Sequence, residues 1–105
     1  MVKKIEINRF VKKVTEEFAP DRVILFGSYA NGSPSDDSDV DLLVIMQHKK
    51  RNVEQALEID RKIDRSFPLD LIVRTPQEIR RRLSMKDIFM SSILHEGKTP
   101  YERSH

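Results

Sequence analysis

Hydrophobic positions near the start of the chain recur at the spacing of a helix. Between residues 7 and 18 they stand at 7, 10, 11, 14 and 18, mostly three or four positions apart, with charged residues filling most of the gaps. Since an α-helix turns once in about 3.6 residues, this spacing places the hydrophobic side chains on one face. Proline cannot continue a helix, so the pattern predicts an amphipathic helix that ends before Pro20. Its predicted buried face consists of Ile7, Phe10, Val11, Val14 and Phe18.

Three later segments are short, apolar and rich in branched side chains, which is typical of buried strands. They are Arg22–Phe26, residues 40–46 and residues 69–73. Residues 27–38, between the first two segments, are polar and contain two glycines and a proline. This composition predicts a loop with one helical turn after Ser28.

Two helical regions are predicted after the second and third strands. Asn52 and Gln55 have the spacing of a helix cap and follow a basic connector. Thr75 and Glu78 have the same spacing, with Pro76 at the first helical position. The predicted buried face of the earlier helix consists of Val53, Ala56, Leu57 and Ile63. The last predicted helix carries Ile88, Phe89, Ile93 and Leu94 and ends at Gly97.

The order helix, strand, loop, strand, helix, strand, helices predicts an α/β (α+β) fold with a small mixed β-sheet flanked by helices. The chain has 105 residues, and no repeat or linker interrupts it. A length of this order supports one small hydrophobic core. We therefore expect residues 1–105 to form a single domain.

Composition indicates a soluble, cytoplasmic protein. Hydrophobic residues make up 38% and charged residues 34% of the chain, and no apolar run approaches the roughly 20 residues of a membrane span. The N-terminal residues lack the apolar stretch of a signal peptide. The absence of cysteine excludes disulfides, thiolate metal sites and a cysteine nucleophile. We expect no membrane partner.

Charge is nearly balanced, with a formal net charge of +2. The one local excess is the basic cluster Arg80, Arg81 and Arg82, with Arg74 and Lys86 nearby. A groove for nucleic acid would need aromatic residues or glycine turns among these cations, and the cluster has none. The cluster is interpreted as a solvated helix face, although an acidic partner protein remains an alternative. Nucleic acid is not expected as a direct substrate.

Two aspartates at the start of the second predicted strand are the first candidates for chemistry. Side chains alternate across a strand, so Asp39 and Asp41 point to the same face. Neighbouring carboxylates repel each other unless a cation lies between them. Magnesium prefers oxygen ligands and keeps coordination positions for water and substrate phosphates. The pair therefore predicts a magnesium site.

Asp70 is the candidate for a third acidic ligand. It interrupts the apolar segment 69–73, where an unpartnered carboxylate would be costly to bury. If this strand pairs beside residues 40–46, Asp70 lies next to Asp41. A third carboxylate allows a second metal ion, and two ions can stabilise the attacking and leaving oxygens together. The alternative is an aspartate that faces water on an edge strand.

Gly27 and Ser28 follow the first predicted strand and predict a phosphate-binding turn. Without a Cβ, Gly27 lets backbone N–H groups approach a phosphate, and Ser28 adds a hydroxyl donor. Gly32 permits the chain to return sharply. A Gly-Ser pair alone is usually only a turn. Combined with Asp39 and Asp41 after it, the turn indicates nucleotide binding.

The chain resembles the minimal nucleotidyltransferase family of the DNA polymerase β-like nucleotidyltransferase superfamily, whose fold resembles the polymerase β palm. The motifs that carry the resemblance are Gly27-Ser28, Ala30-Asn31-Gly32, Ser38-Asp39-Val40-Asp41-Leu42 and Asp70. The resemblance extends over most of the chain, including the ending from Ile93 to Glu102. Asn31 departs from the pattern, because the family usually has arginine there, and asparagine offers a phosphate only neutral hydrogen bonds.

The resemblance implies a magnesium-dependent enzyme that transfers AMP from ATP to a tyrosine of a HEPN-type toxin and releases pyrophosphate, acting as the antitoxin. It implies that Asp39 and Asp41 ligate two Mg²⁺ ions, with Asp70 completing the site and helping to deprotonate the acceptor. Gly27, Ser28 and Gly32 would hold the ATP phosphates.

Two other functions stay open. Asn31 favours a non-catalytic antitoxin that neutralises its partner by binding, and a small hydroxylated molecule is a further possible acceptor. The apolar residues Ile88, Phe89, Met90, Ile93 and Leu94 either complete the core or dock a partner, in a homo- or hetero-oligomer. Tyr29 either stacks on the base or packs under the loop. Neither His48 nor His95 is expected to be catalytic.

Overall fold

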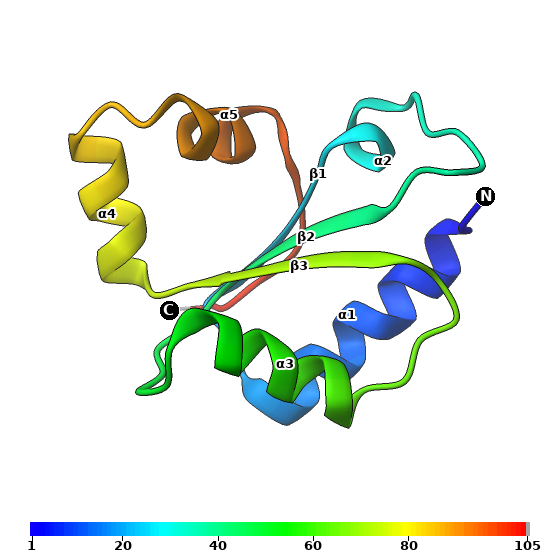
Figure 1. Ribbon diagram of the computed structural model, residues 1–105, viewed down its shortest axis with the longest axis horizontal. Coiled ribbons are helices and arrows are strands. Elements are labelled where there is room, and N and C mark those ends of the chain that lie inside the picture. Colours follow the sequence, from blue (N-terminus) through cyan, green and yellow to red (C-terminus); the bar gives the residue numbers. More distant parts are fainter. Residues whose placement is uncertain (105) are drawn as a thin grey trace.

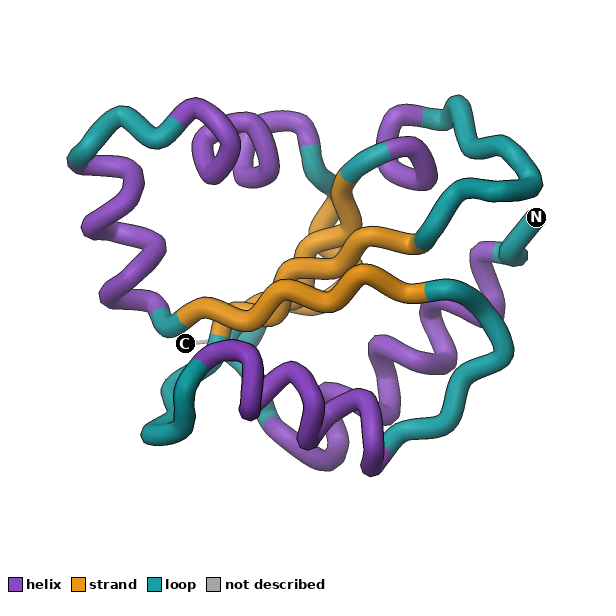
Figure 2. Tube along the Cα trace, viewed as in Figure 1, coloured by secondary structure: helices purple, strands orange, loops and turns teal. Residues whose placement is uncertain are grey.

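The computed structural model describes residues 1–104, which form a mixed sheet with helices on both faces (Figures 1 and 2). The four strands have the order β3-β2-β1-β4. The elements of this described part are α1 (Lys4–Phe18), β1 (Arg22–Phe26), α2 (Ser28–Asn31), β2 (Val40–Ile45), α3 (Asn52–Lys62), β3 (Leu69–Arg74), α4 (Pro76–Ser84), α5 (Ile88–Glu96) and β4 (Lys98–Glu102).

Strand directions make the sheet mixed. β1 is antiparallel to β2 and to β4, whereas β2 is parallel to β3. Parallel neighbours need a crossover between them, and α3 supplies it. The predicted α/β class with a small mixed sheet is confirmed. No helix within residues 1–104 has both the length and the apolar character needed to cross a membrane.

Alternation along β2 divides the core between the two faces of the sheet. Leu42 and Val44 point to the face that α1 and α3 cover, and Leu43 and Ile45 point to the face of α4 and α5 (Figure 1). The core cluster on the first face is the larger one and consists of Ile7, Phe10, Val11, Val14, Val23, Val40, Leu42, Val44, Met46, Ile59, Ile63, Phe67 and Val73. The second consists of Ile24, Leu43, Ile45, Ile79, Met90 and Ile93.

Two of the predicted helices agree closely with the structure. Four of the five residues predicted for the buried face of α1 are buried, and Phe18 is half-buried at the end of the helix. At α4, the Thr75 hydroxyl accepts a hydrogen bond from the Glu78 N–H at 3.2 Å. The Glu78 carboxylate accepts one from the Thr75 N–H at 2.9 Å. The predicted capping box is confirmed, with Pro76 in the first turn.

The prediction for α3 was wrong about its cap and right about only half of its buried face. Arg51, not Asn52, precedes the helix, and Val53 and Leu57 are 59% and 50% exposed. The buried face carries Gln55 and Ile59, and of the predicted residues Ile63 is buried just after the helix and Ala56 is half-buried against the core. Two adjacent stripes on this helix both have helical spacing, and spacing alone does not tell which of them packs on the sheet.

The fourth strand, β4, was not predicted. It pairs with β1 at the edge of the sheet, with Val23 opposite Tyr101 and Leu25 opposite Lys98. Most of its side chains are exposed and polar, and it contains Pro100. Such residues are common on edge strands, where they hinder pairing with other chains, and they leave little hydrophobic pattern to recognise.

Candidate active site

Asp41 and Asp70 lie side by side on neighbouring strands. The parallel register pairs Asp41 of β2 with Asp70 of β3, and neighbouring strands are about 4.8 Å apart. Asp41 shares its face with Leu43, so both aspartates lie at one end of the sheet face that α5 covers. The predicted juxtaposition is confirmed. A role as metal ligands stays a prediction.

Asp39 lies in the loop just before β2 and is exposed, as is Asp70, whereas Asp41 is half-buried. Within residues 1–104, no group of three or more His, Cys, Asp or Glu side chains is arranged to hold a metal ion. The three aspartates are therefore neighbours whose side chains do not converge on one point. Their convergence on an ion stays a prediction.

The electrostatics of Asp41 fit a cation at this position. Burial raises the pKa of the Asp41 carboxyl above its ordinary value, and the charges of Asp70 and Asp39 raise it further, as does a hydrogen bond with Asp70. Each of these causes disfavours the ionised carboxylate. A divalent ion between the oxygens would reverse this effect, and carboxylate oxygens are ligands that Mg²⁺ prefers. The donor set therefore fits a divalent ion.

Gly27 brings the turn after β1 against the Asp41 carboxylate. Its backbone has φ 73° and ψ −154°, a conformation that residues with a side chain rarely adopt. A Cβ at this position would lie 2.2 Å from Asp41 Oδ2. Two constraints thus require glycine, namely the positive φ of the backbone and the close approach of the turn to Asp41.

The short helix α2 begins directly after this glycine. The Gly27 carbonyl accepts hydrogen bonds from the N–H groups of Ala30 and Asn31. The first N–H groups of any helix have no partner within the helix, so they are available to an anion. Gly32 ends α2 in the left-handed conformation with φ 82°. The geometry agrees with a phosphate-binding turn, and the roles of Gly27, Ser28 and Gly32 toward a nucleotide stay predictions.

Asn31 stabilises the loop that follows α2. Its side-chain oxygen accepts hydrogen bonds from the Ser33 N–H at 3.1 Å and from the Ser33 hydroxyl at 2.6 Å. The exposed asparagine therefore closes a local turn. These hydrogen bonds with Ser33 give Asn31 a structural role that an arginine, which has no acceptor, would not have.

An aromatic pair lies next to the aspartates and was not predicted as part of the site. Phe26, the last residue of β1, is directly opposite Asp41 in the antiparallel register. The Phe26 ring meets the Phe89 ring of α5 edge to face, with centroids 6.1 Å apart. Only the position of Phe26 beside the Gly27 turn could have suggested it, because Phe89 is distant in the sequence.

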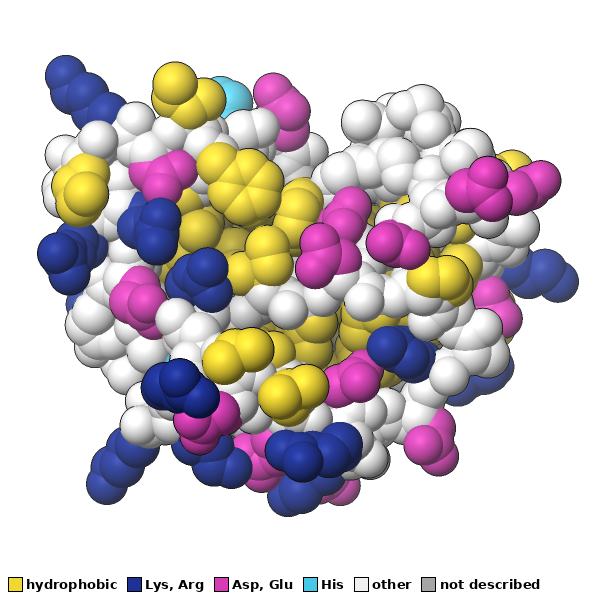
Figure 3. Space-filling view, viewed as in Figure 1, with side chains coloured by type: hydrophobic (Ala, Val, Ile, Leu, Met, Phe, Trp, Pro, Cys, Tyr) yellow, Lys and Arg dark blue, Asp and Glu magenta, His cyan; other side chains and the backbone are white. Residues whose placement is uncertain are grey.

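The apolar residues of α5 divide into a buried set and an exposed set, and docking of a partner by the exposed set stays a prediction. Met90 and Ile93 are 3% exposed and complete the core, whereas Ile88 and Phe89 are 85% and 57% exposed. Figure 3 shows acidic side chains near the centre of one face of the molecule, beside exposed hydrophobic side chains. Exposed apolar surface thus lies beside the acidic residues.

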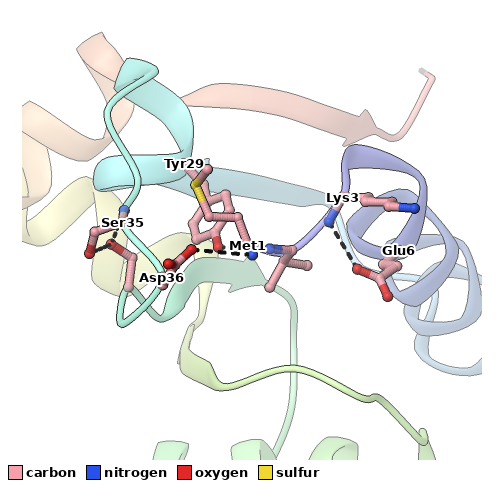
Figure 4. A network of polar contacts seen from close by, with 8 residues as sticks. Met1, Lys3, Glu6, Tyr29, Ser35 and Asp36 are labelled. Atoms are coloured by element: carbon pink, nitrogen blue, oxygen red, sulfur yellow. Dashed lines mark hydrogen bonds and ion pairs between the residues drawn. The ribbon is translucent and has the colours of Figure 1, made fainter.

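Tyr29 points away from the aspartates. It packs against the core cluster on the α1 side of the sheet, and its hydroxyl accepts a hydrogen bond from the Val2 N–H at 3.0 Å (Figure 4). A cavity of about 850 Å³ on this side is lined in part by Tyr29, Val11 and Tyr101, and by none of the three aspartates. Of the two uses predicted for Tyr29, packing under the loop is the one observed.

The remaining candidates lie elsewhere. His48 follows the far end of β2, where its Nε2 forms a hydrogen bond of 2.8 Å with the Asn52 side chain. His95 is exposed in the last turn of α5. Arg80, Arg81 and Arg82 are exposed on α4, and Arg82 pairs with Asp87 at 3.1 Å. This placement agrees with a solvated helix face.

Comparisons with known proteins point to one family. Residues 7–95 match the model of the nucleotidyltransferase domain. The chain is 34% identical over 110 residues to the putative protein adenylyltransferase MJ1305 of Methanocaldococcus jannaschii, an alignment that covers 94% of this chain and 71% of that protein. The crystal structure of a putative nucleotidyltransferase from Sulfolobus solfataricus has the same fold, with a TM-score of 0.65 at 24% identity over 94% of this chain and 79% of that one.

Proposed function

Because the chain belongs to the nucleotidyltransferase domain family, we propose that it transfers AMP from ATP to a hydroxyl group of a protein. Enzymes of this family generally use a nucleoside triphosphate and a divalent metal ion. The observation that carries the proposal is the pairing of Asp41 with Asp70 beside the Gly27 turn. The name of the M. jannaschii relative supports a protein as the acceptor.

The proposed reaction is a substitution at the α-phosphorus of ATP. The acceptor oxygen forms a bond to this phosphorus, the bond from the phosphorus to the oxygen bridging to the β-phosphorus breaks, and pyrophosphate leaves. The hydroxyl proton must move to a base. Asp70 is exposed and adjacent to Asp41, so its carboxylate can meet an acceptor hydroxyl and take the proton.

Asp39 and Asp41 would hold the divalent ions, with Asp70 as a further ligand. When bound, Mg²⁺ supplies positive charge that stabilises the negative charge on the phosphates. Gly27 lies against Asp41 and Ser28 begins α2, so the first N–H groups of α2 can receive the β- and γ-phosphates next to these carboxylates. Gly32, with φ 82°, turns the loop sharply away at the end of α2.

The acceptor in this proposal is a tyrosine of a HEPN-type toxin, and the chain acts as its antitoxin in the cytoplasm. Exposure of Asp39 and Asp70 supports a large acceptor, because a protein surface can reach them directly. The exposed Ile88 offers apolar area for such a partner on α5, the helix that covers the sheet face of the acidic residues. The family resemblance of the sequence motifs supports the identity of the partner.

A second candidate is an antitoxin that only binds its partner. The observation that favours it is the engagement of Asn31 with Ser33, since this leaves no cation at the position where the family usually has arginine. The crowded Asp41 argues against it, because repulsion between carboxylates serves no purpose in a protein that merely binds.

The test is the intact mass of the partner protein encoded beside this chain after incubation with the chain, ATP and magnesium. The proposal expects a mass gain of one or more AMP groups, and no gain with the Asp39→Asn, Asp41→Asn double variant. A stable complex without any mass gain, with both proteins folded, would favour the binding-only antitoxin. AMP transfer to small hydroxylated molecules but not to the protein would contradict the protein acceptor.

A further inference from the structure

The aromatic pair of Phe26 and Phe89 lies on the same sheet face as the acidic residues. Phe26 is opposite Asp41 in the antiparallel register, and directly opposed residues share a face. Phe89 contacts Phe26 from α5, with an angle of 85° between the ring planes. The Phe89 ring therefore contacts Phe26, the residue that is paired with Asp41. We propose that Phe89, positioned by Phe26, is the platform on which the base of the nucleotide stacks.

Exposure of Phe89 leaves its ring available to a ligand. The residue is 57% exposed, whereas Met90 and Ile93 of the same helix are 3% exposed and anchor it to the sheet. Phe26 is half-buried, and its edge-to-face contact with Phe89 limits the orientations of the exposed ring. A ring held in this way has less side-chain freedom to lose when a base stacks on it.

The position of the phosphate turn favours a base at this place. This inference rests on the proposed function, in which the phosphates bind at Gly27 and Ser28, directly after Phe26. A nucleoside that extends from this turn past Asp41 and Asp70 runs along the sheet face that α5 covers. Tyr29, the other aromatic residue next to the turn, is directed to α1 and bonded to Val2, so it is not on the nucleotide side.

Stacking on an aromatic ring has a recognisable specificity. It contributes about 5- to 150-fold in affinity for each base, and it tolerates every base because each has a π-face. Purines have the larger face. We therefore expect ATP and GTP to bind with similar affinity, and UTP to bind more weakly.

Tryptophan fluorescence tests the platform without turnover, since the chain contains no tryptophan. In Phe89→Trp the single indole would stack on the base, so ATP with magnesium should quench its emission saturably in the absence of acceptor. Inorganic tripolyphosphate carries the phosphates without a base and should not quench it. The matched control is Ile88→Trp, at the neighbouring exposed position, and it should not respond to ATP. Equal quenching in both variants, or equal quenching by tripolyphosphate, would overturn the proposal.

Kinetics separate a base platform from a docking site for the acceptor. Phe89→Ala should raise KM for ATP about 5- to 150-fold and leave KM for the acceptor protein unchanged. Phe89→Tyr should keep KM for ATP near that of the wild type. A rise in KM for the acceptor alone would assign Phe89 to acceptor docking and overturn the proposal. Saturable quenching by ATP without any AMP transfer would instead contradict the proposed function and leave the platform intact.

Discussion

Asp41 is strained electrostatically in the folded chain, and Asp41→Asn removes this strain. Its pKa in the folded state is above the ordinary value of 3.8 because of burial and the charges of Asp70 and Asp39. The folded chain is therefore stabilised by the protonated form of Asp41. This stabilisation is fully present below the unfolded-state pKa and is lost as pH rises through the folded-state pKa. At pH 7 the ionised carboxylate bears the cost of its burial and the repulsion from Asp70 and Asp39. Asparagine keeps the size of the side chain without the charge, so the variant should be more stable than the wild type in metal-free buffer.

The distance between the strands sets the size of the effect. Two unit charges about 4.8 Å apart repel by about 1 kcal/mol in water and by about 3 kcal/mol near a protein surface. Asp41 is half-buried and Asp70 is exposed, so solvent screening favours the lower value. For a domain of this size, about 1 kcal/mol corresponds to a rise of about 4–8 °C in Tm.

The assay is thermal unfolding followed by circular dichroism at pH 7, in low salt with EDTA and then with magnesium. Asp41→Asn should raise Tm in EDTA, and magnesium should stabilise the wild type more than the variant, because ligands stabilise the state that binds them. AMP transfer should be lost. Asp37→Asn, in the exposed loop before β2, is the matched control and should keep both Tm and transfer. A lower Tm for Asp41→Asn in EDTA, or wild-type transfer by this variant, would refute the reasoning.

Three further predictions, with five substitutions in all, test the fold and the turn by urea unfolding beside the wild type, with an AMP-transfer assay for the turn. Gly27→Ala places a Cβ against Asp41 at a backbone position with positive φ, so it should lower the free energy of unfolding by about 1–3 kcal/mol and abolish transfer. Wild-type stability and activity in this variant would contradict the close approach of the turn to Asp41. Thr75→Ala removes the cap of α4 and should cost about 1 kcal/mol, whereas Thr75→Ser should restore most of it; equal losses in both would exclude the cap as the cause. Ile59→Ala should lower the free energy of unfolding by about 2–5 kcal/mol because the side chain is fully buried. Leu57→Ala, on the exposed stripe, should lower it by only about 0.5 kcal/mol or less. The reverse order would show that the side of α3 with Leu57 packs on the sheet.

Much of the fold could be predicted because its signals are local. The periodicity of α1, the apolar runs of the three central strands and the capping box of α4 each lie within a few consecutive residues. The buried face of α3 depends on how the helix is placed on the sheet. The edge strand β4 carries polar side chains, and its partner β1 is distant in the sequence.

The candidate site, too, could be predicted from the sequence only in part. Asp41 and Asp70 could be brought together from sequence because two strands separated by one helix commonly pair in parallel. The contact between Phe26 and Phe89 could not, because it joins residues far apart in the chain across the sheet and α5. Asn31 was recognised as a departure, but its bond to Ser33 depends on the conformation of the loop.

Isotope transfer tests the central claim most directly, namely that the aspartates beside the Gly27 turn support transfer of a nucleotidyl group. The partner protein is incubated with the chain, magnesium and ATP labelled at either the α- or the γ-phosphate. The account predicts label on the partner from α-labelled ATP only, and none with Asp41→Asn. Label from γ-labelled ATP would show phosphoryl transfer, and α-label that persists with Asp41→Asn would place the chemistry elsewhere; either result would contradict the account.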